Sequence, residues 1–302
     1  MAPYRRPAPP REEPGTEPHY VPLTRKQERA RRWLRAAPVV LLTIAALWLG
    51  RLWLLLTPVV YGVAVIVSER LHARSLNGRL KAIAGTLARG SEPFVVSRAL
   101  EAVVADSRPY PGFHSVALLF LGIARARGGD LDGALDLLYV VHRAGWLERR
   151  PVWLAWLFPW LSQLHCARGE VDLAARWLEV ARAALPASRH GVLASPEALL
   201  ALRQGRYEEA IASIEACLRA EDAAESTRSH FSFLRAFAYE RAGRPLPVEE
   251  VRAVVSARVA SEGRALPVEK WWAELAAFVE TYAPARESAG SKSSDSHTER
   301  SA

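Results

Sequence analysis

The sequence predicts an all-α protein: a solenoid of about four to five helix–turn–helix repeats with a capping helix, preceded by a transmembrane helix or a helical hairpin. Three observations support this fold class. Half of the residues are hydrophobic with Leu and Ala dominant, long stretches lack both Gly and Pro, and a short Gly-centred pattern recurs along the chain. Leu and Ala favour helix, and self-similarity at a period of some tens of residues is typical of repeat arrays.

Composition divides the chain into four parts. Residues 1–35 are rich in Pro and Arg, and residues 284–302 are rich in Ser. Both are expected to be disordered, because such segments bury too little apolar surface to offset the entropy of ordering. Residues 36–67 contain one charged residue, Arg51, and are expected to form a transmembrane segment. Residues 68–283 then form the helical repeat domain.

The arrangement of the hydrophobic segment has three interpretations. A single helix could span from Trp33 to Trp53, with tryptophans at both membrane interfaces, or from Trp48 to Val67, with Arg51 at the near interface. Alternatively, the chain turns at Gly50–Arg51 and forms a hairpin with both ends on one side. Basic residues flank the segment on both sides, so the positive-inside rule does not decide between them. A hydrophobic hairpin buried in a soluble protein is the fourth alternative.

A six-residue pattern recurs three times in the expected repeat domain. Each copy begins with Gly, continues with a polar and a hydrophobic residue, and ends with Ala: residues 129–134, 169–174 and 205–210. Gly suits a helix end with a tight turn, and a small Ala lets a second helix approach the first. The pattern resembles the tetratricopeptide repeat (TPR), a helix–turn–helix unit, and the resemblance covers roughly residues 75 to 260.

The resemblance assigns residues to both helices of each repeat. They are Leu121, Gly122, Ala134 and Leu138 in the first copy, Leu161, Ala174, Leu178, Ala181 and Pro186 in the second, and Tyr207, Ala210, Ile214 and Cys217 in the third. The third copy departs from the pattern at Glu197 and Ala198, where a Leu-Gly pair is expected. Weaker copies lie on both sides, with helices near residues 76–88, at residues 99–103 and at residues 230–241.

The TPR resemblance also implies a partner groove, lined by the first helices of successive repeats, that accepts a peptide or an extended segment. The matching positions are Ile123, Arg127, Trp156, Gln163, Leu199, Arg203, His230, Phe233, Phe237 and Arg241. Three of them, Arg127, Arg203 and Arg241, occupy equivalent places in their repeats. They predict either a basic stripe that faces an acidic ligand or a solvated helix face.

Three tryptophans form a second candidate site. Trp153, Trp156 and Trp160 share one face of a predicted helix, at positions i, i+3 and i+7. This aromatic patch is interpreted as a core stripe between repeats, as a docking surface, or as a contact with the membrane interface, where Trp is favoured.

The four residues Leu-Pro-Val-Glu occur twice near the end of the repeat domain, at residues 246–249 and 266–269. Each copy is expected to start a helix, because proline is well tolerated in the first turn. After the second copy, Trp271, Leu275, Phe278 and Tyr282 form one apolar stripe. This predicts a terminal helix that covers the last repeat, which a solenoid requires.

Nothing in the sequence points to catalysis, to a cofactor or to a metal. The eight histidines form no HExxH motif, and no phosphate-binding or nucleophile-elbow motif occurs. The net charge of +8 is concentrated before the hydrophobic segment, which favours a membrane rather than nucleic acid or a small-molecule substrate as partner.

The expected function is therefore that of a membrane-anchored scaffold for protein–protein interaction, in a complex of the bacterial envelope at the inner membrane. A self-assembling, homo-oligomeric membrane protein and a soluble helical-repeat regulator are the alternatives. The sequence does not decide on which side of the membrane the repeats lie.

Overall fold

The computed structural model of this chain describes residues 22–48, 56–89, 91–147, 151–219, 225–260 and 266–283, and within these ranges its regular structure is entirely helical. The α-helices are α1 (Arg25–Trp48), α2 (Leu56–Ala88), α3 (Pro93–Ser107), α4 (Pro111–Gly128), α5 (Leu131–Ala144), α6 (Pro151–Arg168), α7 (Val171–Ala184), α8 (Ala194–Arg203), α9 (Tyr207–Leu218), α10 (Glu225–Arg241), α11 (Val248–Ala260) and α12 (Ala273–Tyr282). Short 3₁₀ helices, η3 (Ala187–Leu193) and η4 (Val268–Lys270), precede α8 and α12.

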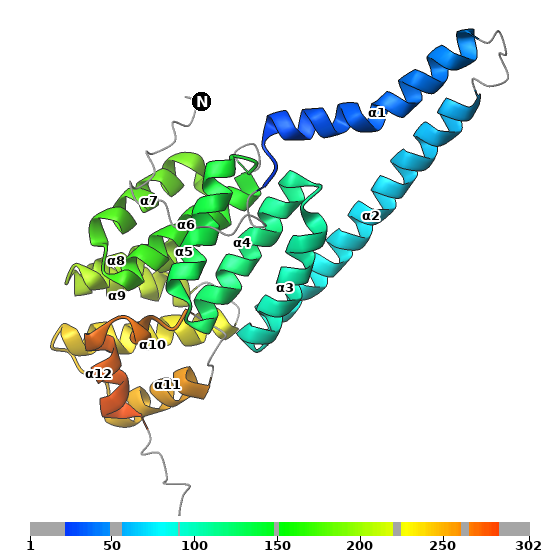
Figure 1. The fold of residues 1–302 in the computed structure, drawn as a ribbon. Coiled ribbons are helices and arrows are strands. Elements are labelled where there is room, and N and C mark those ends of the chain that lie inside the picture. The colour runs from blue at the N-terminus through cyan, green and yellow to red at the C-terminus, as the bar shows by residue number, and fades with distance from the viewer. Residues whose placement is uncertain are drawn as a thin grey trace, which may run out of the picture.

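Successive helices pack as hairpins that stack into one body (Figure 1). The pairs are α2 with α3, α4 with α5, α6 with α7, α8 with α9 and α10 with α11, and α12 packs against the last pair. The first helices α4, α6, α8 and α10 contact one another in sequence, as stacked repeats require. Over the residues that the structure describes, the predicted all-helical solenoid of paired helices with a terminal capping helix is confirmed.

The turn inside each repeat depends on glycine. Gly129, Gly169 and Gly205 have φ values of 92°, 87° and 73°, in the left-handed region that other residues rarely adopt. At the first turn, the N–H of Gly129 donates to Ala126 O over 3.0 Å, and the N–H of Asp130 donates to Arg125 O over 3.0 Å. These bonds satisfy carbonyls at the end of α4, so the chain can reverse directly into α5.

Close approach of the paired helices depends on small residues. A Cβ atom on Gly122 of α4 would lie 3.0 Å from Leu138 Cδ2 and 3.4 Å from the backbone oxygen of Ala134, both on α5. Gly122, Ala134 and Leu138 are buried in the core. The sequence pattern of Gly and Ala thus corresponds to a real contact between the two helices.

The start of the chain forms a different feature, which we call the arm: residues 36–48 of α1 and 56–75 of α2. The two segments run side by side away from the repeat body (Figure 1). Arg35 of α1 and Glu69 of α2 form an ion pair. Leu76, Leu80 and Leu87 in the later part of α2 are buried, so this part of the helix belongs to the first repeat.

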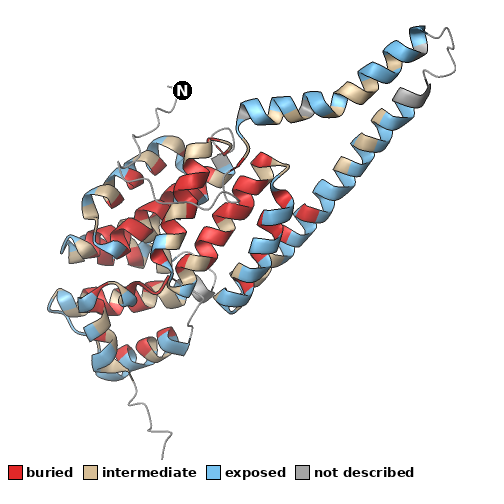
Figure 2. Cartoon of the chain, in the orientation of Figure 1, coloured by how far each residue is buried: buried red, intermediate tan, exposed pale blue. Residues whose placement is uncertain are grey.

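Most of the arm is exposed, in contrast to the buried interior of the repeats (Figure 2). Its exposed large apolar residues are Val40, Leu41, Leu42, Ile44, Leu47, Trp48, Val59, Val60, Tyr61, Val63, Ile66, Val67 and Leu71. Pro38 lies inside α1, which changes direction along its length (Figure 1). A proline inside a helix removes one hydrogen bond and produces such a kink.

Three predicted features lie wholly or partly outside the described residues. They are residues 1–21 of the segment 1–35 predicted to be disordered, the predicted disordered tail in residues 284–302, and residues 49–55 in the middle of the predicted transmembrane segment. Residues 25–35 of that first segment differ from the prediction, because they form the start of α1. None of the helices in the described ranges is both long enough and apolar enough to cross a membrane. The transmembrane segment therefore stays a prediction.

Candidate partner-binding groove

The predicted groove lies on the face formed by α4, α6, α8 and α10, and the chain fills this face itself. Residues 266–272, which we call the strap, precede α12 and lie against these first helices. Ile123, Leu199, Phe233 and Phe237, four of the predicted groove residues, are buried. They belong to one hydrophobic core with the strap residues Leu266, Val268 and Trp272.

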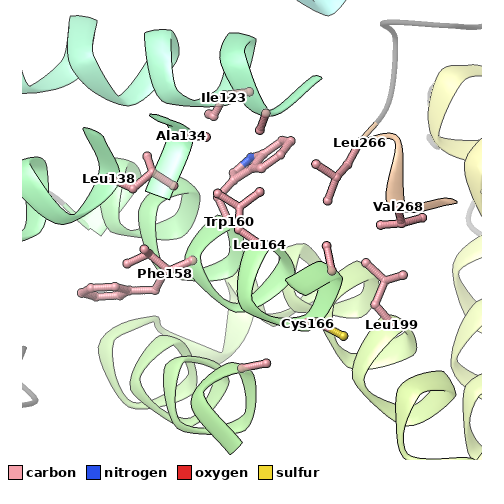
Figure 3. Close-up of a cluster of buried hydrophobic side chains, with 14 of the residues drawn as sticks. Ile123, Ala134, Leu138, Phe158, Trp160, Leu164, Cys166, Leu199, Leu266 and Val268 are labelled. Atoms are coloured by element: carbon pink, nitrogen blue, oxygen red, sulfur yellow. The ribbon is translucent and has the colours of Figure 1, made fainter. Parts of the chain in front are cut away.

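Two aliphatic side chains of the strap enter the core. Leu266 and Val268 are 3% and 1% exposed. In Figure 3, Leu266 points toward Trp160, and Val268 lies beside Leu199. Their burial removes both side chains from water and contributes roughly 1.5 to 3 kcal/mol per side chain.

Arg203 of α8 holds the far end of the strap. Its Nη2 donates to Trp271 O over 3.3 Å and to Ala167 O over 3.0 Å, while Nε donates to Cys166 O over 3.2 Å. Its guanidinium also lies over the Trp272 ring, 4.2 Å from the centroid. A cation over an indole ring adds a favourable electrostatic contact, so Arg203 recognises both the backbone and a side chain of the strap.

Arg258 of α11 holds the near end. Its Nη2 donates to Leu266 O over 2.6 Å and to the Glu269 carboxylate over 2.9 and 3.2 Å. The Arg258 side chain is buried. A buried guanidinium needs a carboxylate nearby, and Glu269 supplies it from the strap.

Positive charge surrounds this contact. Burial, followed by the charges of Arg258 and Arg127, lowers the pKa of His230 to about 3, so this histidine is neutral at physiological pH. The Nδ1 atom of His230 is buried and has no hydrogen-bond partner. Arg127 of α4 and Arg258 of α11 both act on His230 of α10. The carboxylate of Glu269 binds Arg258 in this positively charged region.

The three arginines of the predicted basic stripe all contact their own chain. Arg127 Nη1 donates to Leu87 O over 2.7 Å, and burial lowers the Arg127 pKa. Arg203 binds the strap as described above. The exposed Arg241 pairs with Glu274 of α12, with Arg241 Nη2 3.4 Å from Glu274 Oε2. Of the three arginines, only Arg241 is exposed, as the alternative of a solvated helix face predicts.

The remaining predicted site residues separate from one another. Trp156 of α6 is 45% exposed, and Gln163 is half-buried. Trp153 packs edge-on against Phe120 with ring centroids 5.9 Å apart, and Trp156 lies 6.4 Å from the same ring. Trp160 is buried beside the strap (Figure 3), so the three tryptophans form no single surface patch. Their part in binding stays a prediction.

Sequence reasoning missed the strap. It predicted a helix start at residues 266–270, whereas these residues form only the short turn η4, and α12 begins at Ala273. Trp272 is buried and Trp271 only partly so, which displaces the start of the predicted apolar stripe by one residue. Leu275 and Phe278 are buried as predicted. The repeated Leu-Pro-Val-Glu was the available signal for the strap.

The solved structures that resemble this chain include TPR-like repeat proteins. A crystal structure of the nearly identical TPR-like repeats of a predicted kinesin light chain from Podosopora anserina is 20% identical, with a TM-score of 0.40. The match covers 61% of this chain and 96% of that one. A crystal structure of a variant of the same repeats is 19% identical, with a TM-score of 0.41 and coverage of 64% and 97%. No protein-family model and no curated protein matches the sequence. The paired helices and glycine turns are observed in the chain itself and do not depend on these matches.

Proposed function

We propose that this protein is a helical-repeat scaffold that is held at a membrane by its arm and binds another protein through its repeats. The observation that carries the proposal is the concentration of exposed apolar side chains on the arm. Leu41 and Val60 are each 65% exposed, and Trp48 is 88% exposed. Contiguous apolar surface of this kind marks a contact with a membrane or with another protein.

The shape of the arm suits a hairpin that enters one leaflet. Residues 36–48 and 56–67 would each extend about 20 Å as helix, which is less than the ~30 Å of a hydrocarbon core. The base of the arm is held to the repeats: Trp146 Nε1 donates to Leu23 O over 3.2 Å, and Arg31 Nη1 donates to Pro109 O over 2.5 Å. Both ends of the hairpin thus start from the same body.

Basic residues at the base of α1 support the same orientation. Lys26 and Arg29 are exposed, and Arg31 and Arg35 lie on the same helix. Lysine and arginine next to an apolar segment are attracted to anionic headgroups, at about 1 kcal/mol per residue. We extend the proposal to a partner within a complex at a bacterial inner membrane.

Vesicle flotation of the full chain tests the membrane contact. The chain is synthesised in the presence of vesicles that contain anionic lipid, washed with carbonate and centrifuged. We expect the wild type to float and Leu41→Asp/Val60→Asp to stay at the bottom. Val192→Asp/Val248→Asp, at exposed valines of the repeat body, is the matched control and floats.

Two outcomes would overturn the membrane assignment. One is a double arm variant that floats as well as the wild type. The other is a wild type that stays soluble and elutes as a defined oligomer under light scattering, which would assign the arm to contacts between copies. The scaffold function is tested by crosslinking and pull-down from solubilised membranes, and recovery of no specific partner counts against it.

A further inference from the structure

The strap binds the groove in the manner of a peptide ligand. Its regular hydrogen bonds stay within itself, from Lys270 N to Pro267 O and from Trp271 N to Val268 O. Its main-chain carbonyls are bound by arginine side chains of α11 and α8. Arg258 donates to Leu266 O, and Arg203 donates to Trp271 O. Two arginines thus bind main-chain carbonyls of the strap, and such bonds do not depend on how the strap is connected to the repeats.

Three residues of the strap, Leu266, Val268 and Glu269, have a complement among the residues around them. Leu266 and Val268 fill apolar positions near Trp160 and Leu199 (Figure 3). Glu269 forms the two-oxygen contact with Arg258. Pro267 is buried too, and its missing N–H leaves no donor to satisfy there. The groove therefore matches the order aliphatic, proline, aliphatic, acidic.

We propose that this groove is the partner site of the scaffold, that its ligand is a short protein segment with the order aliphatic–proline–aliphatic–acidic, and that the strap occupies the site until such a segment displaces it. This inference rests on the scaffold function proposed above. The strap is covalently attached, so its effective concentration at the groove is high and only a small fraction of the molecules has an open groove. The apparent affinity for a partner segment is reduced by that fraction.

The first copy of the motif, at residues 246–249, shows that the four residues do not require burial by themselves. In residues 246–249, Val248 is 50% exposed and starts α11. Glu249 pairs with Arg252 in the same helix, over 3.2 Å. The same tetrapeptide thus stands on the surface in one place and in the groove in the other. The first copy supplies a matched control for every substitution in the strap.

Peptide binding to the full chain tests the proposal. The probe is a fluorescein-labelled peptide with the sequence of residues 264–272, RALPVEKWW, titrated onto the chain in detergent micelles and followed by anisotropy. We expect weak binding to the wild type and binding that is ~10-fold tighter to Val268→Ala, because a loosened strap leaves the groove open more often. Val248→Ala should bind like the wild type. A peptide with Glu replaced by Lys should bind neither protein.

Equal, weak binding by the wild type and by a folded Val268→Ala would overturn the proposal and leave the strap as part of the core. Circular dichroism shows whether that variant folds. If it does not, Glu269→Gln carries the test, with Glu249→Gln as its control, because it removes the charge that Arg258 binds and leaves the apolar contacts in place.

Failure of this inference is distinguishable from failure of the proposed function. If pull-down recovers a partner and the chain floats with vesicles, but no strap variant binds the peptide, only the groove assignment falls. If the chain neither floats nor recovers a partner, the scaffold proposal falls, whatever the peptide does.

Discussion

At the scale of single residues, the close contact between α4 and α5 requires that Gly122 has no side chain. Gly122 faces Leu138 at a distance that leaves no room for a large substituent. We expect Gly122→Leu to lower the free energy of unfolding by about 1 to 3 kcal/mol through overpacking. Gly78→Ala, in the open environment of α2, should instead raise it by about 0.5 to 1 kcal/mol. Urea unfolding followed by circular dichroism measures both, and equal effects would refute the contact.

Two histidines of the repeat body make stability depend on pH. Burial lowers the pKa of His165, against the opposing effect of Glu170, and burial with Arg258 and Arg127 lowers that of His230 to about 3. The folded state thus binds fewer protons than the unfolded chain, whose histidines titrate near 6.5. Their contribution to stability is complete above that pH and is lost as the pH falls toward the folded pKa.

The resulting prediction concerns His230. Between pH 7 and pH 5, His230 lowers the free energy of unfolding by up to about 1.4 kcal/mol per pH unit below 6.5, because its folded pKa is about 3. We expect His230→Phe to show a shallower loss than the wild type, and His190→Phe, at an exposed histidine, to match the wild type. Denaturant midpoints at several pH values measure this, and parallel curves for all three proteins would contradict the assignment.

At the scale of elements, the sequence predicts what depends on local residues. The turns at Gly129 and Gly169 need a positive φ, which Gly adopts readily. The Gly that begins each copy of the six-residue pattern therefore marks these turns in the sequence. The strap could not be predicted this way. Leu-Pro-Val-Glu at residues 246–249 leads into the α-helix α11, whereas at residues 266–269 it leads only into the short 3₁₀ helix η4. Identical local sequence gives two structures, so the outcome there is decided by tertiary contacts with Arg258 and the groove.

The sequence pattern predicts which helix positions share the face of the candidate site, but not that the chain itself covers this face. The first-helix positions do form one face, as the repeat pattern implies for Ile123, Leu199 and Phe237. Burial of that face by residues more than a hundred positions after Ile123 depends on long-range packing, which periodicity does not encode. For the same reason, two adjacent tryptophans with identical propensities differ, and only Trp272 is fully inserted.

The capping helix α12 provides a prediction at the element scale. Phe278 is buried against Phe233 and Phe237 of α10, with ring centroids 6.1 and 5.5 Å apart. We expect Phe278→Ala to cost about 3 to 5 kcal/mol. Repeats contact only their neighbours, so hydrogen exchange should quicken in α10 and α11 and stay unchanged in α4 and α5. Uniform loss of protection would show that the chain unfolds as one unit instead.

At the scale of the whole molecule, the arm and the repeat body divide the chain into an apolar projection and a packed core. The contacts at Leu23 and Arg31 tie the start of α1 to the repeats across 123 and 78 positions of sequence. Of the arrangements that the sequence left open, a single span places these partners on opposite sides of a bilayer and breaks both bonds. A hairpin keeps them together.

This geometry predicts the topology. Tags at the two ends of the chain should respond alike to protease: both cleaved in intact spheroplasts, or both protected until lysis. Opposite responses would mean that the chain crosses the membrane an odd number of times, and the hairpin would then be wrong. Arg31→Ala tests whether the hydrogen bond between α1 and the repeats sets the topology. The substitution removes only the bond to Pro109 O, so a hairpin embedded in lipid should keep the same topology. A tag that changes sides in this variant would show that the bond to the repeats, and not the apolar surface of the arm, sets the orientation.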